Sequence, residues 1–512
     1  MDAVVIWLGC AFIFGFGVQR VGFPPLIGYL MTGFGLTYAS QHFGYSLDGE
    51  DALREIGNIG VLILLFTVGL KLDVSEVFKK EVFGTSALHM ALSILVYATV
   101  IHFVFSWEWA TSLLLGSLLS FSSTVLAANS LEERQELRAF HGRMAIGILI
   151  VQDLGAMELI SITSNEAPRM ASLGLMLLCV SRPVFHKVLD WCGHGGILIL
   201  LGLTLAIVGG EVLFHHVLGL SAELGALVMG AMCAKHFKAS ELYSALWPLK
   251  EVFLVGFFMT IGLNGLPSWD DVYFAVVVVA LLPFQALFFF FLLVSFKLKV
   301  RTAFLTTAAL TNFSEFGLIV AAKVMPEWTI PLAVAVSFSF LISAPLNKYA
   351  HTLFDHAEKW LKRFERDGYH PDEAPMTLGA TNILIVGLGQ IGRAAFKEAL
   401  RSNQDKVVLG IDSDAEKVTS LKKLGDYNVT FADADHANFW RTLDTSELDS
   451  VILTCEYDAA LIAIVNLRKQ GFDGDIIAHS KYEDQARKME LAGANHSHMT
   501  LHEAGKGLLS HL

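Results

Sequence analysis

The chain has 512 residues, of which 54% are hydrophobic, and its mean hydropathy is +0.53. Soluble domains hold roughly 45–50% apolar residues, so most of this chain is predicted to lie in a membrane. A formal net charge of -12 without a concentrated Lys/Arg cluster argues against nucleic-acid binding. The five cysteines are scattered without CxxC spacing, which argues against a metal site or a disulfide framework.

Composition divides the chain into two regions. Residues 1 to about 345 are long apolar blocks, whereas the remainder mixes charged and small residues as soluble domains do. We predict a membrane domain at 1–352, a linker helix at 353–378 and a soluble domain at 379–512. Thirteen apolar segments are candidate membrane helices, at about 3–18, 24–40, 56–72, 82–106, 110–131, 140–163, 170–190, 197–214, 219–236, 249–266, 271–296, 302–324 and 328–350.

The loops between these segments differ in positive charge. Lys and Arg gather in short cytoplasmic loops, so the sides of the membrane can be assigned. One set of alternate loops holds three basic residues, namely Arg54, Arg169 and Lys323. The other set holds fifteen, namely Arg20, Lys71, Lys79, Lys80, Arg134, Arg138, Arg143, Arg182, Lys187, Lys235, Lys238, Lys250, Lys297, Lys299 and Arg301. The predicted N-terminus is therefore outside and the C-terminal domain cytoplasmic, in a multi-pass protein of the cell inner (plasma) membrane.

Short sequences recur seven segments apart. FTVGL at 66–70 in the third segment returns as MTIGL at 259–263 in the tenth. Paired glycines of the second segment match a pair in the ninth, namely Gly28 and Gly33 with Gly225 and Gly230. Because seven is odd, the two copies must have opposite orientations, which is the inverted-repeat plan of secondary transporters.

Asp153 lies near the middle of the sixth segment, directly after an apolar run and Gln152. A charged carboxylate at that depth costs roughly 3 kcal/mol or more, so by default it indicates an ion or proton pathway. A buried carboxyl group can also exchange a proton for a metal cation. The alternative is a structural aspartate paired within the helix bundle.

Polar residues also cluster inside the fifth and twelfth segments, again seven apart. SFSST occupies 120–124 and TNFSE occupies 311–315. Such clusters suit broken membrane helices, whose freed carbonyls and polar side chains can coordinate a cation beside Asp153. The candidate ligands are Ser122, Ser123, Thr124 and Asn312. Glu315 either takes part in transport or acts as a structural counter-ion for an arginine such as Arg143.

The C-terminal region carries a dinucleotide-binding pattern. A short apolar strand at 382–386 precedes GLGQIG at 387–392, a helical stretch follows, and a second strand ends in Asp412. In this context Gly387, Gly389, Gln390, Ile391 and Gly392 bring backbone amides to a phosphate, and Asp412 accepts hydrogen bonds from ribose hydroxyls. An acid at this position disfavours a 2′-phosphate.

Further strands are predicted at 429–432, 450–454 and 475–478, which indicates a parallel sheet. Asp433 and Thr454 are candidate nucleotide contacts, with ordinary strand-end polarity as the alternative for both and for His479. The region supplies no second domain to hold a substrate against a nicotinamide. We therefore predict a ligand-sensing module and a secondary active transporter, and no enzyme.

These motifs together resemble the Kef-type potassium/proton antiporters of the monovalent cation:proton antiporter-2 family, across essentially the whole chain. FPPLIGYL at 23–30 is similar to the family's second helix, LLFTVGL at 64–70 to its third and SST at 122–124 to its broken fifth. Gln152 with Asp153 matches the Gln-Asp pair of potassium-type members, and SEF at 314–316 resembles the family's Gly-Glu-Phe. Residues from 380 onward resemble the RCK N-terminal (KTN/TrkA-N) domain.

The resemblance implies an NhaA/NapA-like fold in a homodimer, with Asp153 and Gln152 at the ion site. It implies alternating-access exchange of K+, or of Na+, for H+, and gating by AMP or NAD(H) bound to the cytoplasmic domains. The loop at 239–250 has one acidic residue where glutathione-gated members have an acidic run, so glutathione regulation is not expected. A potassium channel with an RCK domain is the main rival, but no TVGYG-like filter is present. A membrane oxidoreductase is a second rival, for which no substrate site is found.

Overall fold

We describe the protein from a computed structural model of all 512 residues. The described residues are 2–44, 50–71, 78–134, 136–137, 139–163, 175–218, 220–234, 236–366, 370, 378–402, 405–425, 427–432, 434, 439–440, 443–480 and 482–499. They form two compact units, one of Met1–Gln135 with Met144–Arg366 and one of Glu136–Arg143 with Asp367–Leu512. Each unit is described by itself.

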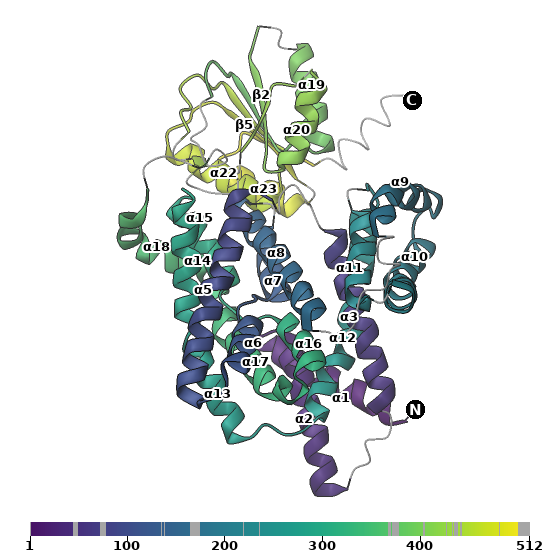
Figure 1. Cartoon of the computed structure of the whole chain (residues 1–512). Coiled ribbons are helices and arrows are strands. Elements are labelled where there is room, and N and C mark those ends of the chain that lie inside the picture. The colour runs from purple at the N-terminus through teal and green to yellow at the C-terminus, as the bar shows by residue number, and fades with distance from the viewer. Residues whose placement is uncertain are drawn as a thin grey trace. The chain divides into compact units, whose positions relative to one another are not determined.

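The first unit is entirely helical in its described residues (Figure 1). Each of the thirteen predicted segments contains at least one helix. In chain order these are α1 (Asp2–Arg20), α2 (Pro25–Phe43), α3 (Glu50–Leu70), α5 (Lys80–Phe105), α6 (Trp109–Leu119), α7 (Thr124–Glu133), α8 (Phe140–Thr163), α9 (Leu175–Trp191), α10 (Gly196–Ile207), the π-helix η2 (Val208–Leu218), α11 (Ala222–Cys233), α12 (Ala239–Leu263), α13 (Trp269–Val279), α14 (Leu282–Ser295), α15 (Val300–Leu310), α16 (Glu315–Val324), the 3-10 helix η3 (Pro326–Trp328) and α17 (Thr329–Lys348).

Seven helical spans in the described part of the chain are long and apolar enough to cross a membrane, and four of them join two neighbouring helices, as α6 and α7 do. An eighth span forms if α15 and α16, which meet at an angle of 42°, are taken together. The remaining segments, such as α11, are shorter or more polar and require neighbouring helices to cover their ends.

The repeated glycines lie at two helix crossings that correspond to each other in the repeat. A β-carbon on Gly33 of α2 would come within 2.8 Å of the Gly262 Cα of α12. A β-carbon on Gly230 of α11 would come within 3.0 Å of the Gly69 Cα of α3. Glycine allows this close backbone approach. The second segment therefore crosses the tenth in the same way as the ninth crosses the third. A repeat that pairs the second segment with the ninth, and the third with the tenth, requires this correspondence.

Two groups of helices make up this unit. In the first, α3 packs extensively on α11 and α12, and α2 packs on α1 and α12. In the second, α5 packs on α6 and α14, and α13 packs on α17. The described contacts between α12 and α17 are far sparser than those within either group. This arrangement leaves an interface between the two groups, where the candidate site lies.

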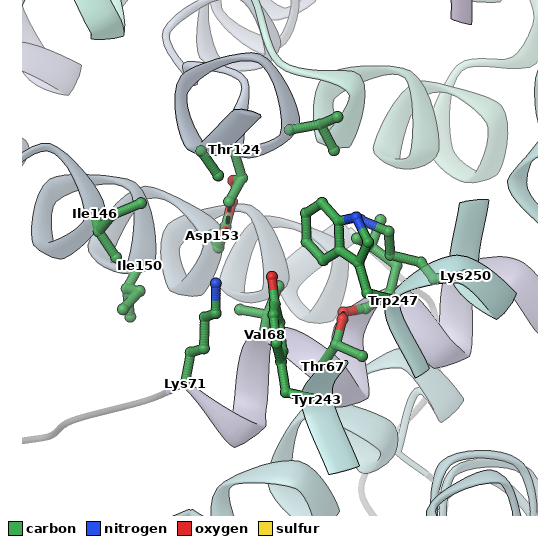
Figure 2. Close-up of a pocket in the computed structure, with 13 residues that line it drawn as sticks. Thr67, Val68, Lys71, Thr124, Ile146, Ile150, Asp153, Tyr243, Trp247 and Lys250 are labelled. Carbon is green, nitrogen blue, oxygen red and sulfur yellow. Dashed lines mark hydrogen bonds between the residues drawn. The ribbon is translucent and has the colours of Figure 1, made fainter. Parts of the chain in front are cut away.

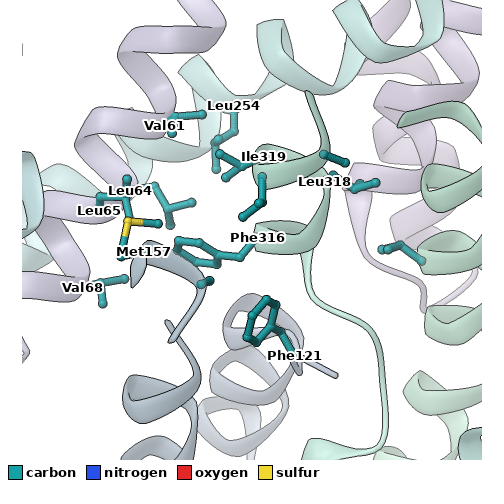
Figure 3. Packing of buried hydrophobic residues seen from close by; sticks show 14 of the residues in the cluster. Val61, Leu64, Leu65, Val68, Phe121, Met157, Leu254, Phe316, Leu318 and Ile319 are labelled. Atoms are coloured by element: carbon teal, nitrogen blue, oxygen red, sulfur yellow. The ribbon is translucent and has the colours of Figure 1, made fainter. Parts of the chain in front are cut away.

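Apolar side chains fill part of that interface (Figure 3). Leu64 and Leu65 of α3 lie opposite Met157 of α8 and Phe316 of α16, and all four are at most 2% exposed. Burying one such side chain contributes about 2 kcal/mol. The cluster therefore closes the interface on the side toward Val61 of α3.

An amphipathic helix, α18 (Ala350–Leu361), and a 3-10 turn, η4 (Lys362–Phe364), follow the last membrane helix. The predicted linker helix starts three residues later, at 353. Ala350 and Phe354 of α18 are buried, and α18 packs on α15. In the structure α18 therefore belongs to the first unit.

The second unit contains a six-stranded parallel sheet in the order β3-β2-β1-β4-β5-β6. Helices alternate with the strands, as the right-handed crossovers of a Rossmann-like fold require. The elements are β1 (Ile383–Val386), α19 (Gln390–Ser402), β2 (Val408–Asp412), α20 (Ala415–Lys423), β3 (Val429–Phe431), β4 (Ser450–Leu453), α22 (Tyr457–Lys469), β5 (Asp475–Ser480), α23 (Glu483–Leu491) and β6 (His496–Met499). The predicted α/β class is confirmed, and β6 was not predicted.

Candidate functional site

The polar cluster at 120–124 is a break between helices. α6 ends at Leu119 and α7 begins at Thr124, so the last carbonyls of α6 and the first amides of α7 lack partners within a helix. Side chains supply replacements. The Ser122 amide donates to the Gln152 Oε1 of α8 at 2.9 Å, and the Ser123 amide donates to the Asn312 Oδ1 at 2.5 Å. The Ser123 hydroxyl caps α7 by accepting from the Leu126 amide.

The cluster at 311–315 forms the second break, between α15 and α16. The Phe313 amide donates to the Ser339 hydroxyl of α17 at 3.1 Å, and the Ser343 hydroxyl donates to the Thr311 carbonyl. The Ser314 hydroxyl caps α16 by accepting from the Phe316 amide. Both predicted broken helices are therefore present, and Asn312 joins one break to the other.

Asp153 lies in α8 beside the first break. Its carboxylate accepts a hydrogen bond from the Thr124 hydroxyl, at 3.1 and 3.3 Å from the two oxygens, and the residue is 1% exposed. Thr124 is the first residue of α7, so the positive end of that helix faces the carboxylate. Carboxylate and hydroxyl oxygens are the ligands that hard cations prefer.

Gln152 holds the helix break through its oxygen. That oxygen already accepts from the Ser122 amide, while Nε2 is buried without a hydrogen-bond partner among the described residues. That oxygen has a second lone pair, so Gln152 stays a candidate cation ligand. Its hydrogen bond to Ser122 also holds the helix break beside Asp153.

Glu315 lies close to Asp153 and is also 1% exposed. One oxygen accepts from the Ser123 hydroxyl at 2.6 Å and the other from the Val125 amide at 3.4 Å. Lys250 of α12 acts on Glu315 electrostatically without forming an ion pair with it in the described residues. The counter-ion role toward an arginine such as Arg143 stays a prediction. Glu315 therefore reinforces the first break and carries a second acidic group next to Asp153.

A cavity opens on Asp153 between α3 and α12 on one side and α7 and α8 on the other (Figure 2). It offers about 30 Å³ to the centres of water-sized molecules, which is enough for one or two waters or for a bare cation. The lining comes from α3 and the residue after it, from α7, from α8 and from α12, namely Leu64, Thr67, Val68, Lys71, Thr124, Val125, Ala128, Ile146, Ile150, Asp153, Tyr243, Trp247 and Lys250.

The aromatic and basic residues of this lining were not predicted from the sequence to belong to the site. Tyr243, Trp247 and Lys250 recur at four- and three-residue spacing, which places them on one face of α12. Lys250 lies over the Trp247 ring at 3.3 Å from its centroid, and Lys71 lies over the Tyr243 ring at 3.8 Å. The spacing on α12 was a usable signal, whereas nothing in the local sequence connects Lys71 to it.

In the second unit the glycine-rich turn joins β1 to α19. Gly387 has a φ of +88°, a conformation that favours glycine, and a β-carbon at Gly392 would come within 2.6 Å of the Thr454 hydroxyl oxygen. A β-carbon at Gly389 would meet open space, so this face of the turn is free for a ligand. Gln390 and Ile391 form the exposed first turn of α19, where backbone amides can bind a phosphate.

Asp412 lies at the end of β2, as predicted, and is 7% exposed. It accepts from the Leu388 amide at 2.6 Å and from the Asp414 amide at 2.9 Å. The Lys417 amino group also donates to both of its oxygens, at 2.9 and 3.1 Å. A ribose that binds Asp412 must share it with Lys417 or displace that side chain.

Two other predicted contacts have different outcomes. The Thr454 hydroxyl donates to the Val386 carbonyl at 2.9 Å and to the Gly387 carbonyl at 2.5 Å. It therefore holds the glycine-rich turn in place. Asp433 lies outside the described residues.

Two broken helices, packed around a buried carboxylate in an inverted-repeat bundle, define a helical secondary transporter. Residues 8–348 match the family described as sodium/hydrogen exchanger, transmembrane, and residues 383–500 match the TrkA-N domain. The chain belongs to the sodium/hydrogen exchanger family. It combines a cation/proton antiporter domain with a C-terminal regulatory TrkA-N domain.

Solved structures similar to this chain include the sodium proton antiporter MjNhaP1 from Methanocaldococcus jannaschii. That similarity has a TM-score of 0.52 at 13% identity and covers 70% of this chain and 99% of MjNhaP1, which shows a shared fold. The TrkA-N domain of the inner membrane protein ybaL from Escherichia coli is 22% identical, with a TM-score of 0.23, and the match covers 26% of this chain and 96% of that domain.

Proposed function

We propose that this protein exchanges a monovalent cation for protons by alternating access, with K+ as the preferred cation. The observation that carries the proposal is the Asp153 carboxylate, which lies beside two cross-bonded helix breaks and opens on a cavity between two helix groups. Apolar side chains such as Leu65 and Phe316 pack on the side of Asp153 toward Val61, and alternating access would open that side in a second conformation. Cation and proton would then occupy the same carboxylate in alternation.

The preference for K+ and the Kef-type assignment rest on the Gln152–Asp153 pair and on the resemblance of the motifs. We assign residues 1–352 to the exchanger, 353–378 to a linker whose helix α18 packs on the exchanger, and 379–512 to the nucleotide-binding domain. By the loop charges the N-terminus is outside and the second unit cytoplasmic. The functional form is a homodimer in the cell inner membrane, and AMP or NAD(H) bound to the TrkA-N domain gates exchange.

Cation selectivity is tested with purified full-length protein in proteoliposomes that carry an imposed pH gradient. We expect K+ to collapse the gradient at least about tenfold more effectively than Na+ or Li+, a difference of about 1.4 kcal/mol in transition-state free energy. The measurement is made with nucleotide-loaded and with nucleotide-free protein, because the regulatory domain can block exchange in one of these two states. A higher rate with Na+ would make the protein a Na+/H+ antiporter.

Nucleotide binding is tested by calorimetry on the same purified protein. We expect Asp412→Asn to weaken NAD(H) or AMP binding about tenfold, because a charged carboxylate accepts from ribose hydroxyls more strongly than an amide does. The amide oxygen can still accept from the Leu388 amide, which holds the glycine-rich turn, whereas the bond from the Asp414 amide is lost. Asp405→Asn, at an exposed position, is the control. Equal affinity for both variants would remove Asp412 from the nucleotide site.

A further inference from the structure

The cavity beside Asp153 contains two lysines that have no role in the proposed exchange step. Lys250 comes from within α12, is fully buried and forms an ion pair with Glu251 at 3.2 Å. Lys71 follows the last residue of α3, and its amino group contacts the rings of Tyr243 and Trp247, at 3.8 and 5.7 Å from their centroids. Among the described residues no carboxylate forms an ion pair with Lys71.

The Lys71 side chain reaches into the cavity from its rim. The residue as a whole is exposed, while its amino group points to the part of the cavity where Asp153 and Thr124 lie (Figure 2). Aromatic faces stabilise a cation by about 1 kcal/mol and leave it free to move. The Lys71 amino group can move in this way because its side chain has four methylene groups and its backbone lies just after the end of α3.

The charged and titratable groups around Lys71 come from several elements. α7 contributes Glu132, α8 contributes Asp153, and α12 contributes Tyr243, Lys250 and Glu251. Glu132 stabilises the protonated amine, and Lys250 destabilises it. Lys71 is therefore the basic group of the cavity that is held by aromatic rings without an ion-pair partner in the described residues.

We propose that protonated Lys71 is a resident cation, which competes with the transported cation for Asp153 and thereby sets the cation affinity of the exchanger. The inference rests on the proposed function and adds a specificity-determining residue to it. When Lys71 is neutral, the carboxylate is open to K+ or Na+. When Lys71 is charged, the entering cation must displace it.

The amino group inside the cavity is largely removed from water, and this desolvation lowers the pKa of Lys71 from 10.5 to about 8. Below pH 8 the amine is therefore mostly charged and competes, and above pH 8 it is mostly neutral and releases the site. The expected consequence is a rise in apparent cation affinity through pH 8. This rise is separate from the pH dependence that proton competition at Asp153 produces.

The test measures the apparent KM for the cation between pH 7 and 9 in proteoliposomes, for the wild type, Lys71→Met and Lys71→Arg. Arginine stays charged over this range and methionine carries no charge. We expect Lys71→Met to have an apparent KM about tenfold lower than the wild type at pH 7, the order of effect that one unit charge exerts across such a cavity. Lys71→Arg should keep the high KM up to pH 9. Lys80→Met, which removes an exposed lysine at the start of α5, controls for loss of surface charge.

The three pH profiles decide the outcome. The proposal predicts that only the wild type shows the additional change in apparent KM through pH 8. In both variants the apparent KM should still depend on pH through proton competition at Asp153, with the same slope. Identical profiles for all three proteins, or a wild-type transition in Lys71→Arg, would overturn it. If the wild type exchanges no cation, the proposed function itself fails, which is a separate result.

Discussion

Asp153→Asn is expected to reduce cation-dependent proton movement at least about a hundredfold. Asparagine keeps the shape of the side chain and can still accept from the Thr124 hydroxyl, but it cannot bind and release a proton. The loss of exchange is therefore chemical, since the packing around a residue that is 1% exposed is retained. The rate is measured in proteoliposomes with K+ and with Na+ on the outside.

The matched control for this substitution is Glu158→Gln, which neutralises an exposed acid five residues further along α8. That variant should exchange at the wild-type rate. The thermal unfolding temperature in detergent should be similar for all three proteins. Exchange by Asp153→Asn at the control rate would show that the transported ion does not use this carboxylate.

Asn312→Ala is expected to give the second largest effect, through the connection between the two helix breaks. The Asn312 oxygen accepts from the Ser123 amide, and its nitrogen donates to the Ala309 carbonyl at 2.9 Å. Removing these partners leaves buried backbone groups unsatisfied, which costs about 1–3 kcal/mol for each group. We expect a lower unfolding temperature and an exchange rate reduced about tenfold or more.

Asn264→Ala is the control for this variant, because Asn264 is exposed after the end of α12. Both the unfolding temperature and the exchange rate of that variant should match the wild type. If Asn312→Ala behaves as Asn264→Ala does, the bond between the two breaks has no part in holding the site.

Much of this architecture is predictable from the sequence because the membrane imposes simple constraints. Long apolar segments must be helices there, so the membrane domain and the two broken helices follow from apolar runs and clustered hydroxyl residues. The repeated glycines predict the inverted repeat. At Gly33 and Gly230 a β-carbon would meet the backbone of the crossing helix, which explains why these two positions are glycine. In the soluble domain, the spacing from the glycine-rich turn to Asp412 predicts the Rossmann-like sheet.

The pairings within the sites are not predictable in the same way. Each depends on side chains brought together from distant helices, such as Asn312 with the Ser123 amide or Glu315 with the Ser123 hydroxyl. The role of Gln152 in holding the break appears only when its hydrogen bond to Ser122 is seen. Strand β6 was missed for a different reason, because its sequence HSHM is polar and lacks the apolar pattern of a strand.

The central claim is that Asp153 couples the movement of a cation to that of a proton. The most direct test sets up a K+ gradient across proteoliposomes at equal internal and external pH, holds the membrane voltage at zero, and records the internal pH. The account predicts that K+ flow drives protons in the opposite direction and creates a pH gradient, and that Asp153→Asn creates none. Flow of K+ without any pH change would contradict the account and would instead indicate a channel.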